Sequence, residues 1–120
     1  PMKDENYCTI GGRITHDPGI YAAPNGWLLS FSIANHSHYP ANSKPMFIEV
    51  KVGVTSDRTK MDEFATRLPK GRKVTIHAAE LQVKDWKPSD SDETKRSFHL
   101  FCRMDQIYLQ DLPKKTLAAA

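Results

Sequence analysis

The strongest constraint on the fold is that a single helical pattern lies among several strand patterns. Between Asp57 and Leu68, the apolar residues follow the spacing of an amphipathic helix of about three turns, at Met61, Phe64, Ala65 and Leu68. Ser56 or Asp57 is suited to cap its start, and Pro69 with Gly71 ends it. This one apolar stripe needs a sheet to cover it, because no other helix is predicted.

Alternating apolar and polar residues predict strands on both sides of the helix. In the clearest strand, residues 46–54, one face carries Met46, Ile48, Val50, Val52 and Val54. Phe47 lies on the opposite face, where its neighbours of the same parity are the charged residues Glu49 and Lys51. We therefore expect Phe47 to be exposed on the outside of the sheet.

The remaining strands are predicted at 7–14, 27–33, 74–86 and 98–104, with 107–112 extending the last one. Pro24-Asn25-Gly26 predicts a hairpin turn, and residues 36–44 and 87–93 predict loops. Ala78-Ala79 indicates a β-bulge. After this bulge, Leu81 and Val83 share one face, and the outward face carries Gln82, Lys84 and Trp86.

The element order is therefore β-β-β-α-β-β. Five strands can bury the stripe of a single helix if the sheet curls and the helix plugs its open end. The predicted fold is all-β with one helix: an OB-fold, which is a five-stranded Greek-key barrel with the helix between strands 3 and 4. With 120 residues, we expect one domain at 6–112, and terminal segments at 1–5 and 113–120 that are tag-derived or disordered.

Composition excludes several classes of protein. Charged residues make up 26% of the chain and no apolar run approaches the ~20 residues of a membrane span. Lys and Arg exceed Asp and Glu by 17 to 14, which permits a polyanionic partner. Residues 1–7 are charged rather than apolar, so we expect no secretory signal and a cytoplasmic location.

Metal and cofactor sites are not indicated. Cys8 and Cys102 lie far apart without CxxC spacing, and buried free thiols are the favoured interpretation. The His36-x-His38 pair lies in a polar loop that offers no further ligands. No phosphate-binding glycine loop and no nucleophile elbow is present. We expect neither catalysis nor a cofactor.

Seven short motifs occur together in an order that resembles the bacterial and phage single-stranded DNA-binding (SSB) proteins of the OB-fold superfamily. They are Asn6, Gly12, Asp17-Pro18, Pro24-Asn25-Gly26, Phe31-x-Ile33-Ala34, Phe47-Ile48-Glu49-Val50 and Leu68-x-Lys70-Gly71. Each motif is weak alone, but their joint order spans residues 6 to about 109. The resemblance implies an OB-fold that coats and protects single-stranded DNA, and self-association into a dimer or tetramer.

Aromatic and cationic residues supply an independent reason for this function. Binding single strands without regard to sequence requires aromatic faces for base stacking and cations for phosphates. Phe47 and Trp86 have this setting by strand parity, and the resemblance matches both, together with Tyr39, to base-stacking positions of the family. The candidate phosphate contacts lie in or beside strands: Arg13, Lys51, Arg72, Lys73, Lys84 and Lys87.

We therefore expect a non-catalytic protein of DNA replication, repair and recombination, which binds single-stranded DNA, itself and replication or recombination proteins, but no membrane. The alternative is an OB-fold primosomal or conjugation adaptor whose main partner is a protein, docked on apolar residues such as Trp27 and Leu28. A nuclease is a third class, but strand-embedded acids are few, chiefly Glu49 and Glu80.

Overall fold

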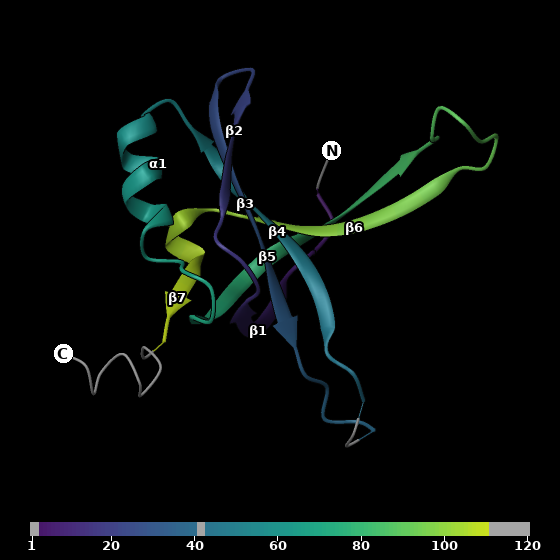
Figure 1. The fold of residues 1–120 in the computed structure, drawn as a ribbon, viewed down its shortest axis with the longest axis horizontal. Coiled ribbons are helices and arrows are strands. Elements are labelled where there is room, and N and C mark those ends of the chain that lie inside the picture. Colours follow the sequence, from purple (N-terminus) through teal and green to yellow (C-terminus); the bar gives the residue numbers. More distant parts are fainter. Residues whose placement is uncertain (1–2, 41–42, 111–120) are drawn as a thin grey trace.

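The computed structural model describes residues 3–40 and 43–110, which form one curled sheet with a single α-helix at one end (Figure 1). The elements are β1 (Cys8–Ile14), β2 (Gly19–Ala23), β3 (Gly26–Asn35), β4 (Met46–Thr55), α1 (Arg58–Ala65), β5 (Lys73–Trp86), β6 (Lys95–Cys102), the 3₁₀ turn η1 (Met104–Gln106) and β7 (Ile107–Leu109). Residues 111–120 lie outside the described residues, so the expectation for the end of the domain and for the C-terminal segment is not addressed.

Five strands form a closed ring. The order around it is β1-β3-β4-β6-β5, and β5 pairs back to β1. All pairs are antiparallel except β4 with β6, which run parallel. β2 forms a hairpin with β3, and β7 adds to β5. The predicted fold, an OB-fold barrel with one helix between its third and fourth ring strands, is confirmed.

The inward row of each ring strand builds the core. Leu29, Phe31 and Ile33 of β3 face Val50 and Val52 of β4, and all five are fully buried. Strand alternation alone produces this arrangement, because every second side chain points into the barrel. Phe47 and Glu49, on the other parity of β4, are exposed as predicted.

The helix α1 covers one end of the barrel, as expected from its stripe. Asp57 caps it by accepting a hydrogen bond from the Lys60 N–H at 3.1 Å. The helix is shorter than the predicted three turns, since it ends at Ala65. Leu68 still reaches the core and is fully buried. The early end fits Pro69, which disfavours helical backbone at the residue before it.

The C-terminal part differs from the prediction. Residues 107–109 do not extend β6, because η1 turns the chain and β7 pairs with β5 instead. The Gln106 side chain stabilises this turn by accepting a 2.7 Å hydrogen bond from the Arg103 N–H and by donating to the Ala78 carbonyl at 2.9 Å. The tertiary contact with β5 thus ends the last ring strand early.

The predicted bulge in β5 is present at Ala78, whose φ is +55°. The β1–β5 register shifts opposite it, between Cys8 and Ile10. The hydroxyl of Thr9 accepts a 3.0 Å hydrogen bond from the Ala78 N–H. The backbone N–H that the bulge removes from strand pairing is therefore still hydrogen-bonded.

Beyond the bulge, β5 and β6 leave the barrel as a two-stranded arm that extends away from α1 (Figure 1). The arm corrects the expectation for Leu81 and Val83, which lie on the face opposite the outward row but are exposed. Phe98 is exposed as well, although it has the same parity as the buried Leu100 and Cys102. The core ends before it reaches them. Met46, at the start of β4, is exposed for the same reason.

Candidate nucleic-acid interface

The outer face of the barrel can be followed by the strand register. One row joins Ser32 of β3, Glu49 of β4, His99 of β6 and Gln82 of β5. A second row joins Lys73, Arg13, Ala34 and Phe47 across β5, β1, β3 and β4. Directly paired residues place their side chains on the same face, so Phe47 shares a face with two of the predicted cations.

Three residues with exposed aromatic side chains line one hollow, with Tyr21 and Phe47 on this face and Phe98 on the opposite parity of β6. Its volume is about 480 Å³, and Tyr21, Phe47 and Phe98 on its wall are 59%, 67% and 58% exposed. Ser30, Ser32 and Glu49 form its polar part, with His16 and Asp17 at one side. Exposed aromatic rings around a hollow present flat faces on which unpaired bases can stack.

Two of these rings were missed by the sequence analysis. Phe98 shares the parity of the core residues Leu100 and Cys102, so nothing local marks it as exposed. Tyr21 lies in the short hairpin strand β2, opposite Leu28. Its position between Ile20 and Ala22 carried a weak alternation signal that could have found it.

The arm carries a second group of predicted site residues. Trp86 is exposed and pairs in register with Lys95, and Lys84 and Lys87 are exposed beside it. A bidentate ion pair between Asp85 and Arg96, at 2.8 and 3.3 Å, joins the two strands of the arm. The hydrogen bond from Arg96 lowers the pKa of Asp85. Trp86 does not line the hollow that contains Phe47, so the predicted aromatics occupy separate places.

The other predicted residues are scattered. Tyr39 is exposed in the loop after β3, where its backbone N–H donates a 3.2 Å hydrogen bond to the Ser37 hydroxyl. Arg72 is half-buried and donates through Nε to the Gln110 carbonyl at 3.1 Å, which ties its guanidinium to the backbone near β7. Lys51 is half-buried on the outer face, and it pairs with Phe101, two residues after His99 in β6.

His99 lies in the middle of the outer face and is nearly buried. Its Nε2 forms a 2.8 Å hydrogen bond with the Gln82 side chain across the β5–β6 pair. Burial lowers the pKa of His99, and the neighbouring Lys51 lowers it further. The imidazole therefore favours its neutral form, which leaves the positive charge of this region to the lysines.

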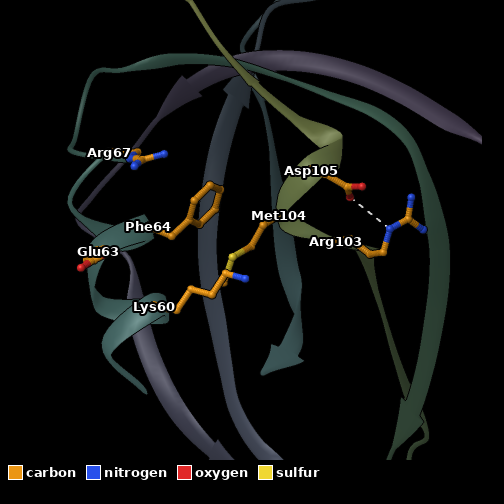
Figure 2. Close-up of a pocket in the computed structure, with 7 residues that line it drawn as sticks. All are labelled: Lys60, Glu63, Phe64, Arg67, Arg103, Met104 and Asp105. Atoms are coloured by element: carbon orange, nitrogen blue, oxygen red, sulfur yellow. Dashed lines mark hydrogen bonds and ion pairs between the residues drawn. The ribbon is translucent and has the colours of Figure 1, made fainter. Parts of the chain in front are cut away.

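A further hollow, of about 560 Å³, lies between α1 and η1 (Figure 2). The side chains of Phe64 and Met104 point toward each other across its floor, and the surrounding charges are mixed: Lys60, Glu63, Arg67, Arg103 and Asp105. Arg103 donates to Asp105 at 3.0 Å. This hollow lies at the helix end of the barrel and has neither stacked aromatic rings nor a single sign of charge.

The apolar residues considered as a protein-docking patch are largely covered. Trp27 is half-buried and packs against the core, and the Arg58 guanidinium lies over its ring at 4.6 Å from the centroid. Leu28 is also half-buried. The bulky indole at position 27 thus contacts both the core and the first turn of α1.

The part of the chain that the structure describes holds no metal-binding cluster, and its two cysteines are free. Within residues 3–40 and 43–110, no three His, Cys, Asp or Glu side chains gather as a metal site. Cys102 is buried and its pKa is raised to about 12 by that burial, so its thiol is a poor nucleophile. Cys8 is half-buried and also free. None of the described helices is long and apolar enough to span a membrane.

Comparison with solved structures finds proteins of similar fold, whereas the two sequence comparisons find no match. The fold is similar to a Plasmodium falciparum SSB solved in complex with single-stranded DNA, with a TM-score of 0.72 and 21% identity over 92% of this chain and 99% of that one. It is also similar to a small single-stranded DNA-binding protein from Streptomyces coelicolor, with a TM-score of 0.58 and 16% identity over 82% of this chain and 89% of that one. No protein-family model and no curated protein sequence matches the chain.

Proposed function

We propose that this protein binds single-stranded DNA and coats it with little sequence preference, without cutting it. The observation that carries the proposal is the outer face itself, where Phe47, which lines the hollow with Tyr21 and Phe98, lies in one register row with Arg13 and Lys73. The fold likeness to SSB structures supports it, since one of them was solved with single-stranded DNA.

The geometry suggests a path for the strand. Bases stack on Phe47 and its neighbours, and the phosphates follow the cations on either side. Arg13 and Lys73 lie on β1 and β5, Lys51 lies on β4 opposite Phe101, and Lys84 lies in the arm, where Trp86 offers another ring. Stacking contributes ~1–3 kcal/mol per base and tolerates any base. The one α-helix of the described residues, α1, covers an end of the barrel and is not placed to read a groove, which agrees with a low sequence preference.

The direct test is a fluorescence titration with a dT oligomer at two salt concentrations. We expect saturable binding that quenches tryptophan fluorescence, because Trp86 stacks on a base while Trp27 stays under Arg58. Affinity should fall with salt, with ~0.7 counterion released for each phosphate contacted. A labelled strand incubated with magnesium or calcium should stay intact. Absence of binding at low salt would refute the proposal.

We also propose that the protein associates with itself into a dimer or tetramer. Among residues 3–40 and 43–110, strand β1 pairs with β5 along most of its length but with β3 only at Arg13 and Ile14, so one edge of residues 8–10 has no strand neighbour there. Tyr7 is exposed nearby, and Asn6 fastens this segment to Leu81 through hydrogen bonds of 2.9 and 3.0 Å. A second copy can complete this edge.

Sedimentation velocity over a range of protein concentrations measures this association. We expect a species of twice or four times the 13.6 kDa chain mass. Replacement of Thr9 by Pro would not be a clean probe, because Thr9 also holds the bulge at Ala78. Tyr7→Glu adds a charge to the exposed segment instead, and we expect it to weaken association. Monomer alone at every concentration contradicts this part of the proposal.

A further inference from the structure

A second hollow on the outer face is lined by cations and histidines. Its volume is about 430 Å³, and Arg13 of β1, Lys73 of β5, and His36 and His38 of the loop after β3 contribute to its wall. From the sequence alone, the two histidines are expected to be ordinary polar residues of the loop. The fold brings them to the same hollow as two of the predicted phosphate contacts.

The charges around this hollow are of one sign. None of its lining residues is acidic, and Asn35, Thr75 and Gln110 supply the polar remainder. Arg13 and Lys73 are direct cross-strand partners, an arrangement that costs free energy for like charges. Within residues 3–40 and 43–110 neither forms an ion pair, and Arg13 donates only to the Gly71 carbonyl, at 3.1 Å. An anion in the hollow would relieve this repulsion.

The wall of the hollow includes a stretch of β1 that has no side chains. Gly11 and Gly12 of β1 line it without side chains. A Cβ at Gly12 would lie 2.5 Å from the Ala34 carbonyl oxygen, so only glycine allows β1 and β3 to approach as they do here. Among the described residues, neither imidazole takes part in a side-chain hydrogen bond, so the ring nitrogens of His36 and His38 are available to a ligand.

We infer that this hollow is a phosphate-binding subsite of the single-strand interface, and that protonation of His36 and His38 strengthens its hold on the strand. The inference rests on the proposed function. The row Lys73, Arg13, Ala34, Phe47 connects the subsite to the aromatic hollow, so one strand can stack on Phe47 and place a phosphate here. Histidine side chains acquire their charge between about pH 8 and pH 5.

The test is the affinity for a dT oligomer at pH 8 and pH 6, for the unaltered protein, the double variant His36→Gln with His38→Gln, and the control His77→Gln. We expect acidification to tighten binding roughly 2-fold to 30-fold, as two exposed charge contacts allow. The salt dependence should steepen by up to ~1.4, which is about 0.7 for each added phosphate contact. The double variant should lose both changes. His77 lies against Tyr108, outside the hollow, so its variant should keep them.

The outcomes separate the subsite from the function. Equal pH dependence in the double variant and the unaltered protein, or no pH dependence in either, overturns the inference while the strand still binds. Loss of the pH dependence in His77→Gln overturns it too. A titration with inorganic phosphate, followed by the histidine ring signals in NMR spectra, is the second readout. Shifts of His36 and His38 with no binding of dT at either pH would retain the phosphate site and reject the proposed function. Absence of such shifts, with pH-independent binding of dT, rejects the subsite.

Discussion

Replacing Phe47 by Ala is expected to weaken the affinity for a dT oligomer by roughly 5-fold to 150-fold, which corresponds to ~1–3 kcal/mol for one stacked base. The side chain is 67% exposed, so it is not needed to fill the core. It lies between the aromatic hollow and the row that leads to Arg13, where a base has a ring beneath it and a cation within two strands. The measurement is the tryptophan-fluorescence titration, repeated at two salt concentrations.

Two variants make this result specific. Phe47→Trp keeps an aromatic face and should retain most of the affinity. Tyr108→Ala removes a similarly exposed ring from β7, outside the aromatic hollow, and should bind like the unaltered protein. The salt dependence should be nearly the same in Phe47→Ala, because no cation has been removed. Undiminished affinity in Phe47→Ala would remove Phe47 from the interface.

The second large effect concerns stability. Phe31→Ala should lower the free energy of unfolding by ~3–5 kcal/mol, because it removes a large buried ring and leaves a cavity. Phe31 is only 1% exposed, and it pairs in register with Val50 on the neighbouring strand β4. The total free energy of unfolding of a domain is ~5–15 kcal/mol, so this loss is a large fraction of it. Urea denaturation followed by circular dichroism measures it.

The matched control is Phe98→Ala, the same change of side chain on the exposed arm. It should alter the free energy of unfolding by less than about 0.5 kcal/mol, as is usual for surface positions. Equal losses in the two variants would mean that the arm belongs to the cooperative core. A small loss in Phe31→Ala would contradict the barrel packing described above.

Much of the fold could be predicted because its signals are local. The alternation of residues 46–54 separates Phe47 from the core row of Val50 and Val52, and strand geometry preserves that separation in any sheet. The single helix stripe, capped at Asp57, requires a curled sheet to cover it. The bulge at Ala78 also has a local sign, since two apolar residues in succession break the alternation.

The candidate site was predicted less completely, because it depends on which residues from distant strands meet. Phe98 has the same strand parity as the buried Leu100 and Cys102, but it lies in the arm, which extends beyond the barrel. Strand parity does not predict burial where no core packs against that face of the strand. Arg72 reads as a free cation but donates to the Gln110 carbonyl. The sequence indicates only that His36 and His38 are polar loop residues. In the fold, the pairing of β1 with β5 brings Arg13 and Lys73 to the same hollow as these two histidines.

The sequence by itself therefore determined the kinds of element, their order and the faces of the ring strands, since these follow from spacing along a few consecutive residues. Only the tertiary structure decided where the barrel ends, which rings share a hollow and which cations lie side by side. Those properties arise from pairings such as Arg13 with Lys73 and Glu49 with His99, whose partners are many residues apart in the chain. Local periodicity carries no information about such pairings.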